Sequence, residues 1–218
     1  MPRISAASNA AQRAETQHRI LTAFGELLFT HGLPGLTMTD VARHARIGRT
    51  AVYNYYADIE ELLIGYALDE TGRFLLDLRE SLDSLENPVE RLAFYVRAQV
   101  EDLSRRHLPP GPAMGAVLSP ASFAKLADHV GDLNVLLQGI LRDGIAQGYL
   151  PAADVGQLAQ LIHGTLASSA ARGDGAGHGP EAEPEAGVEA RIARTVRFIQ
   201  LGAGASLDDA GRPVRIGA

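Results

Sequence analysis

A short stretch near the N-terminus concentrates side chains that can donate hydrogen bonds to DNA. Residues 49–56 contain one arginine, one threonine, one asparagine and three tyrosines. Ala51 and Val52 supply a small inward face, which we expect Tyr56 to complete. The side chains left to point elsewhere are those of Arg49, Thr50, Tyr53, Asn54 and Tyr55. A solvated surface explains this set poorly, whereas a recognition helix entering a major groove explains it well.

The residues just before this stretch predict a second short helix and a tight turn. Thr37 and Asp40 have the spacing of a capping box, in which each side chain satisfies a backbone N–H of the other's residue. An apolar stripe follows, and Arg46-Ile47-Gly48 then interrupts it. Ile47 is the apolar residue of the turn, so we expect it to fill the angle between the helices. Together the two helices predict a helix-turn-helix.

The order of motifs over residues 12–64 resembles the DNA-binding part of tetracycline-repressor (TetR) family regulators. The segments that carry the resemblance are Phe29-Thr30-His31-Gly32, Leu36-Thr37-Met38-Thr39-Asp40-Val41-Ala42, Ala51-Val52-Tyr53-Asn54-Tyr55-Tyr56 and Glu60-Glu61-Leu62-Leu63. The rest of the chain fits the family in helix count and length only. The resemblance implies a homodimeric, ligand-responsive transcriptional repressor that binds a near-palindromic double-stranded DNA operator.

The resemblance also implies which residues contact DNA. It places Thr37 and Thr39 at phosphates, and Arg43 and Arg46 near the DNA backbone. The full set is Thr37, Thr39, Arg43, Arg46, Arg49, Thr50, Tyr53, Asn54 and Tyr55. The alternative for Tyr53 is packing within the small domain, and packing is the preferred interpretation for Tyr56.

Two positions depart from the pattern of the family. Arg46 stands where the family usually has glycine in the turn, which predicts a slightly different turn or an added phosphate contact. Ile59 replaces a frequent lysine at the start of the fourth helix, so one usual phosphate contact is expected to be lost.

Composition limits the class of protein. The chain has 218 residues, 46% of them hydrophobic, which is enough for one sizeable domain or two small ones. It contains no cysteine, so disulfides and thiolate chemistry are excluded. The apolar runs are shorter than a bilayer span, and the N-terminus has no hydrophobic signal segment. We therefore expect a soluble cytoplasmic protein without a membrane partner.

The net charge of −6 is unevenly distributed. Residues 1–60 carry six arginines and five acidic residues, whereas residues 61–218 carry 14 basic and 21 acidic residues. Phosphate would repel the acidic part but not the N-terminal part. Non-specific DNA affinity is therefore expected to be modest and strongly dependent on salt.

Helical periodicity along the whole chain, with no convincing alternating run, predicts an all-α fold. The expected organisation is a disordered arm over residues 1–10, a helix-turn-helix domain over 11–60, a ligand-binding and dimerisation bundle over 61–203 and a loose tail over 204–218. One helix crosses the boundary near residue 60. Residues 173–187 are rich in glycine, proline and glutamate and predict a flexible loop.

The boundaries of the later helices follow from their caps. Asp58 is expected to begin a long helix, Pro88 to occupy the first position of the next, and Asp154 to cap the penultimate helix. Ser119-Pro120 opens another long helix that ends at Gly148. The last helix is expected over residues 189–201.

The resemblance assigns effector binding to the C-terminal bundle. The candidate lining residues are Tyr66, Phe74, Tyr95, Gln99, Met114, Phe123, Asn134 and Gln138. Their aromatic and amide content favours a mostly apolar, uncharged small molecule. The alternative for each is ordinary core packing or, for the amides, the surface of a helix.

The last two helices are expected to pair with those of a second copy. The candidate interface residues are Leu158, Leu161, Ile162, Gly164, Thr165, Ala167, Ser168, Ile192, Val196 and Ile199. His163 is expected either at this interface or at the edge of the ligand pocket. The alternative is a hydrogen-bonded histidine in the core, which is the commoner situation for such a residue.

No pattern in the sequence predicts catalysis. The seven histidines are scattered without metal-binding spacing, and there is no nucleophile motif. The glycine-rich run at residues 173–177 follows no strand, so it predicts a loop rather than a nucleotide cradle. We therefore expect no enzyme activity, metal or cofactor. The alternative function is a small-molecule-binding or scaffolding helical protein that does not bind DNA specifically.

Overall fold

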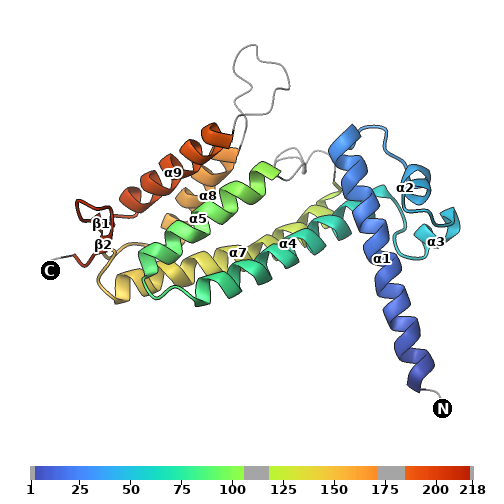
Figure 1. Ribbon diagram of the computed structural model, residues 1–218, viewed down its shortest axis with the longest axis horizontal. Coiled ribbons are helices and arrows are strands. Elements are labelled where there is room, and N and C mark those ends of the chain that lie inside the picture. Colours follow the sequence, from blue (N-terminus) through green and yellow to red (C-terminus); the bar gives the residue numbers. More distant parts are fainter. Residues whose placement is uncertain (1–2, 106–117, 171–184, 217–218) are drawn as a thin grey trace, which may run out of the picture. The chain divides into compact units, whose positions relative to one another are not determined.

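The computed structural model describes residues 3–105, 118–170 and 185–216, and most of them are helical (Figure 1). The all-α prediction is confirmed, apart from one small hairpin. The helices are α1 (Arg3–His31), α2 (Met38–His44), α3 (Arg49–Tyr53), α4 (Ile59–Asp83), α5 (Pro88–Arg105), α7 (Pro120–Ala146), α8 (Val155–Ala170) and α9 (Glu185–Gly202). The hairpin pairs β1 (Ser206–Leu207) with β2 (Pro213–Val214) in antiparallel register.

The chain forms two compact units that divide within α4, between Gly72 and Arg73. The first contains α1, α2, α3, the first part of α4 and the start of α7. The second contains the rest of α4 and α7 together with α5, α8, α9 and the hairpin. This division lies twelve residues beyond the expected boundary at residue 60, and the helix that crosses it is α4, in line with the expectation that one helix spans the boundary.

Side-chain caps set the starts of several helices, as the sequence predicts. The Thr37 side chain accepts from the backbone N–H of Asp40, and the Asp40 carboxylate accepts from the backbone N–H of Thr37. Asp58 accepts from Glu61 N at 2.8 Å at the start of α4. Asp154 accepts from Gln157 N at 3.0 Å before α8. These bonds satisfy N–H groups that a helix leaves unpaired in its first turn.

The core of the first unit is apolar and well enclosed. Ile20 and Phe24 of α1, Val41 of α2, Val52 of α3 and Leu62 of α4 are all completely buried. They come from each helix of the unit, so α1 and α4 hold the two short helices in place. Because isolated helices of five to seven residues are unstable in water, α2 and α3 depend on this packing.

The core of the second unit forms around α5. Helix α5 lies beside both α8 and α9, and these two helices also lie beside each other (Figure 1). Leu92 and Val96 of α5 are fully buried with Leu137 of α7. At the surface Arg97 donates to both carboxylate oxygens of Glu189, at 2.7 and 2.9 Å, and so joins α5 to α9.

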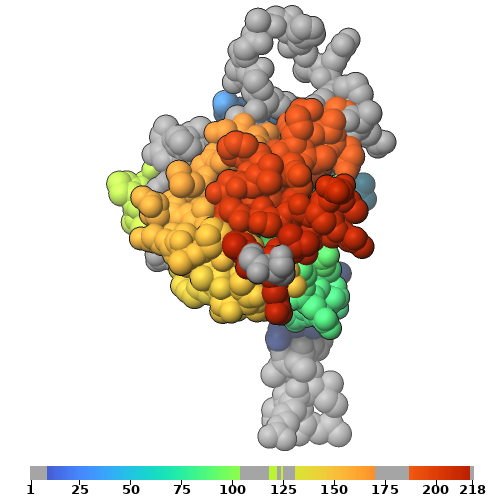
Figure 2. Space-filling model, turned by 90° about the vertical axis from the view of Figure 1, so that its left-hand side faces the viewer, coloured from blue at the N-terminus to red at the C-terminus, as the bar shows by residue number. Residues whose placement is uncertain are grey.

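Both ends of the chain differ from expectation. Residues 3–10 continue α1 rather than forming a disordered arm. Instead of a loose tail, residues 206–214 form the hairpin, which Figure 2 shows in red with α9 against α8 and α7. Ile216 N donates to Gly148 O at 2.8 Å, which fastens the chain after the hairpin to the end of α7.

The expected flexible loop and last helix also change in extent. Residues 171–184 lie outside the part of the chain that the structure describes, so the loop prediction is not tested there. Residues 185–187 belong to α9, which begins four residues earlier than the expected residue 189. Along the described residues, none of the helices combines the length and apolar character needed to span a bilayer.

One close contact in the first unit predicts a measurable loss of stability. A Cβ added to Gly65 would lie 2.5 Å from Cε1 of buried Tyr56. We expect Gly65→Ala to lower the free energy of unfolding by about 1–2 kcal/mol, because overpacking outweighs the better helix propensity of alanine. The measurement is thermal and urea unfolding.

The matched control is Gly139→Ala in α7, where an added Cβ would meet no atom within 4 Å. This substitution should raise stability by up to about 1 kcal/mol. A Gly65→Ala protein as stable as the native chain would contradict the packing described for Tyr56.

Candidate nucleic-acid interface

The turn between α2 and α3 fixes the geometry of the helix-turn-helix. Arg46 has a φ of 55°, which is the left-handed region that favours glycine. This backbone conformation explains why glycine suits the position in the family. Arg19 of α1 donates to Ala45 O at 2.7 Å and to Arg46 O at 3.3 Å, so α1 holds the turn in place.

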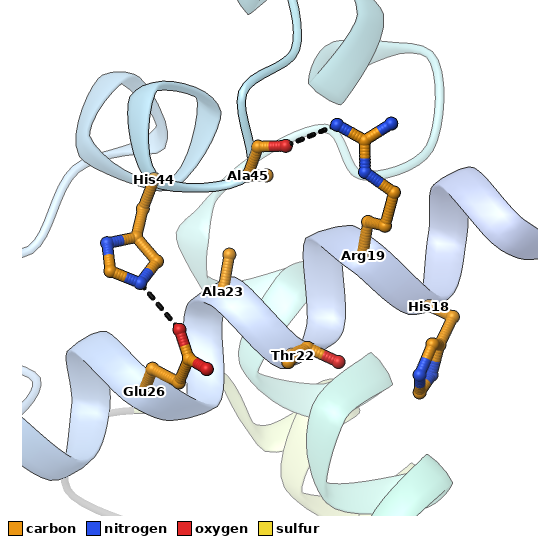
Figure 3. A pocket seen from close by; sticks show the side chains of 7 residues that line it. All are labelled: His18, Arg19, Thr22, Ala23, Glu26, His44 and Ala45. Carbon is orange, nitrogen blue, oxygen red and sulfur yellow. Dashed lines mark hydrogen bonds and ion pairs between the residues drawn. The ribbon is translucent and has the colours of Figure 1, made fainter.

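A second link between α1 and α2 lies in a pocket of about 300 Å³ (Figure 3). His44 Nε2 at the end of α2 is 2.6 Å from Glu26 Oε2 of α1. In Figure 3 this pair and the Arg19 bond to Ala45 lie on either side of Ala23. The pocket is therefore lined by the contacts that position the helix-turn-helix on α1.

The outward face of α3 carries the groups that the sequence predicts for DNA contact. Arg49, Thr50 and Asn54 are exposed, and the Tyr53 side chain is 43% exposed. The Arg49 guanidinium lies over the Tyr53 ring, 5.7 Å from its centre. Tyr53 does not belong to the apolar core of the first unit, which favours the DNA-contact interpretation over packing within the small domain.

The recognition helix is shorter than predicted. It ends at Tyr53, with Asn54 as its C-cap, whereas the expected helix reached residue 56. Tyr56 is buried and its hydroxyl accepts from Gln17 Nε2 at 3.1 Å, so the packing role preferred for Tyr56 is confirmed. Burial raises the pKa of its hydroxyl above the ordinary value. Ending α3 early lets Tyr56 turn back into the core.

The residues around α2 have local partners. Thr37 Oγ1 donates to Asp40 Oδ2 at 2.5 Å, and Arg43 donates to Asp40 Oδ1 at 2.6 Å. The Thr37 bonds and then the Arg43 charge hold the pKa of Asp40 below its ordinary value. Thr39 is exposed at the start of α2. Tyr55 is half-buried, with the Arg13 guanidinium 5.5 Å from its ring centre.

The second unit contains a buried polar cluster, and two of the predicted effector-binding residues, Tyr95 and Gln99, belong to it. The Tyr95 hydroxyl is 3.1 Å from His163 Nε2, 3.3 Å from Leu133 O and 3.4 Å from Gln99 Nε2. Tyr95 is completely buried and Gln99 is nearly so. Burial raises the pKa of Tyr95 and lowers that of His163, because both charged forms are poorly solvated there.

The other predicted effector residues do not join this cluster in the described structure. Tyr66 packs edge-on against Phe24 in the first unit, which places it outside the bundle core. Gln138 accepts from Arg142 on the next turn of α7, and Phe74 packs at the edge of the core. Asn134 is partly exposed on α7. Met114 and the side chain of Phe123 lie outside the described residues.

The predicted dimer residues separate into three groups. Ile162, Ile192 and Ile199 are buried within the core of their own unit, so assigning them to an interface between copies is wrong. Leu158 and Val196 are partly buried against the same core. The remaining residues lie on the outer side of α8, namely Leu161, Gly164, Thr165, Ala167 and Ser168.

Sequence analysis missed two exposed apolar residues of α9. Phe198 is 65% exposed and Leu201 is 51% exposed. Their positions are offset from the buried stripe of Ile192 and Ile199. The sequence does contain a sign of this second apolar surface, because apolar residues of α9 occur on two sides of the helix and only one side can face the core. Within the described residues, no group of histidine and acidic side chains is arranged to hold a metal ion.

Comparison with known proteins agrees with this geometry. The family model for bacterial regulatory proteins of the tetR family matches residues 20–65. The chain is 36% identical over 74 residues to the transcriptional regulator AlkX of Mycobacterium tuberculosis, covering 34% of this chain and 35% of that protein. It is 27% identical over 174 residues to the transcriptional repressor KstR2 of the same species, covering 76% and 82%.

Solved structures show the same fold over most of the chain. The FadR regulator of Bacillus subtilis, solved with stearoyl-CoA, superposes with a TM-score of 0.70 at 19% identity and covers 84% of this chain and 96% of that one. A helix-turn-helix with an exposed hydrogen-bonding face, followed by a helical bundle, defines a DNA-binding transcriptional regulator. Over residues 20–65, which contain the helix-turn-helix, the chain resembles the tetR family of bacterial regulatory proteins.

The partly buried side chain of His163 predicts a pH dependence of stability. Since the pKa of His163 is lower in the folded protein, the unfolded chain binds the extra proton first as the pH falls. Its contribution to stability is therefore complete above about pH 6.5 and is lost as the pH falls toward the folded pKa. We expect urea midpoints to decrease from pH 7.5 to pH 5.5.

In His163→Asn this decrease should be smaller. The same substitution at exposed His18 serves as the control and should leave the decrease intact. An identical pH profile for native and His163→Asn proteins would show that His163 is not buried in the neutral form.

Proposed function

We propose that the protein is a ligand-responsive homodimeric repressor of a near-palindromic operator. The observation that carries the proposal is the outward face of α3, where Arg49, Thr50, Tyr53 and Asn54 present donors suited to base edges and phosphates. Two copies related by two-fold symmetry would read half-sites with centres about 34–36 Å apart. Such a regulator acts in the cytoplasm and needs no cofactor or catalytic residue.

The exposed apolar residues of α8 and α9 support the homodimer. Leu161 is 67% exposed, and Phe198 and Leu201 are more than half exposed, on two helices that lie side by side. A second copy would remove these side chains from water. The small residues Gly164 and Ala167 on the same helix as Leu161 would allow the helices of the two copies to approach closely.

The effector is proposed to be a mostly apolar molecule such as an acyl chain with a polar head. Tyr95, Gln99 and His163 offer hydrogen-bonding groups within an otherwise apolar bundle core. The stearoyl-CoA bound to the B. subtilis FadR regulator supports this class. Since α4 belongs to both units, a ligand that prefers one position of α4 would shift the balance between DNA-binding and non-binding states.

Selection of bound duplexes from a random DNA pool tests the DNA-binding proposal. We expect enrichment of an inverted repeat, which then serves as the probe for release by acyl ligands. The double variant Arg49→Ala with Tyr53→Phe should lose this specific binding, by about a hundredfold or more, while dimer mass and helical content stay unchanged.

Two outcomes would count against the proposal. If the folded dimer enriches no sequence at low salt, the scaffolding alternative becomes the better interpretation. If the double variant keeps its operator affinity, the assignment of α3 as the recognition helix is wrong.

A single charge on the exposed face of α9 tests the dimer surface. We expect Phe198→Asp to convert the dimer to monomer in sedimentation measurements, because burying an unpaired carboxylate in an apolar interface is costly. Val135→Asp is the matched control, since Val135 is 64% exposed on α7. A Phe198→Asp protein that remains dimeric would place the interface elsewhere.

A further inference from the structure

The inward stripe of α1 changes character halfway along the helix. Ile20, Phe24 and Leu27 are buried in the core of the first unit. At the same helical spacing toward the N-terminus, the stripe continues with polar side chains, those of Asn9, Gln12, Arg13 and Thr16. A helix that only closed the core would have no reason to direct a polar stripe along the same face.

This polar stripe forms one wall of a groove beside the recognition helix. The groove has a volume of about 520 Å³, and its opposite wall consists of Ala51, Asn54 and Tyr55. Its seven described lining residues include three amides, one guanidinium and two hydroxyls but no acid. The groove therefore presents hydrogen-bond donors together with a positive charge.

The position of Arg13 in this groove is defined by aromatic packing. Its guanidinium lies 5.5 Å from the centre of the Tyr55 ring. Stacking of this kind orients the planar guanidinium and leaves its N–H edges available for a further partner. Arg13 makes no ion pair with any carboxylate among the described residues, unlike Arg43, which is paired with Asp40.

We propose that this groove is a second DNA-contact surface, in which Arg13 binds a backbone phosphate beyond the base pairs that α3 reads. The groove includes Asn54, the C-cap of α3, so a strand bordering the major groove would pass beside it. Amides and guanidinium groups donate to phosphate oxygens without reading sequence. The inference rests on the proposed DNA-binding function and extends it to the N-terminal half of α1.

Salt dependence of operator binding tests the proposal in the full-length dimer. Each phosphate contact contributes about 0.9 to the slope of log affinity against log salt. Arg13→Gln removes one contact from each of two protomers, so the slope should become shallower by about 1.8. At about 0.15 M salt the affinity should fall roughly 30-fold, by the same factor for operator and for random duplex.

Two control variants separate a phosphate contact from a structural effect. Arg13→Lys keeps the charge and should keep most of the slope. Arg79→Gln removes an exposed arginine of α4 in the second unit and should leave both slope and affinity unchanged. Thermal unfolding and circular dichroism of each variant report on folding.

The possible outcomes are distinct. A native slope in Arg13→Gln overturns the proposal, even if affinity falls, because only a lost phosphate contact changes the slope. Arg13-dependent binding of inorganic phosphate without DNA would identify a site for a small anion instead. Failure of the native protein to select any operator would overturn the proposed function itself, whereas a selected operator with an unchanged Arg13→Gln slope would overturn the second surface alone.

Discussion

The arrangement of α2 and α3 depends on the backbone of Arg46. A left-handed conformation costs a residue with a side chain about 1–2 kcal/mol relative to the right-handed one, so other contacts must stabilise it. The two bonds from Arg19 to the turn carbonyls and the Glu26–His44 pair come from the same helix. The exposed face of α3 is therefore oriented by α1, because α3 has only five residues of its own.

This dependence gives α1 two separate tasks. Its C-terminal half supplies the apolar stripe on which the two short helices pack, and it also supplies Arg19 and Glu26. Its N-terminal half extends past that core with polar groups on the same face. A mutation in the C-terminal half should therefore affect the position of the whole helix-turn-helix, whereas a mutation in the N-terminal half should alter only the contacts made there.

Sequence patterns predict the local features well, because capping and hydrophobic period are local. The caps at Thr37 and Asp154 and the burial of Tyr56 illustrate this. The same patterns do not show whether an apolar face of a helix packs within its own unit or remains exposed. Ile192 and Phe198 are both apolar residues of α9, yet one is buried within its own unit and the other is exposed. The terminal hairpin was missed because two-residue strands leave almost no periodicity to detect.

Charge explains why single arginines matter in this protein. The chain carries a net charge of −6, and most of the excess acid lies after residue 60, so the protein as a whole has no general attraction for DNA. Within the described part of the first unit, Arg19 is used by the turn and Arg43 by Asp40. Among the other arginines of this unit whose side chains the structure describes, Arg13, Arg46 and Arg49 are the candidates for binding phosphate. With few cations to contact phosphate, we expect weak overall affinity for DNA, and discrimination between sequences to depend on the base contacts of α3.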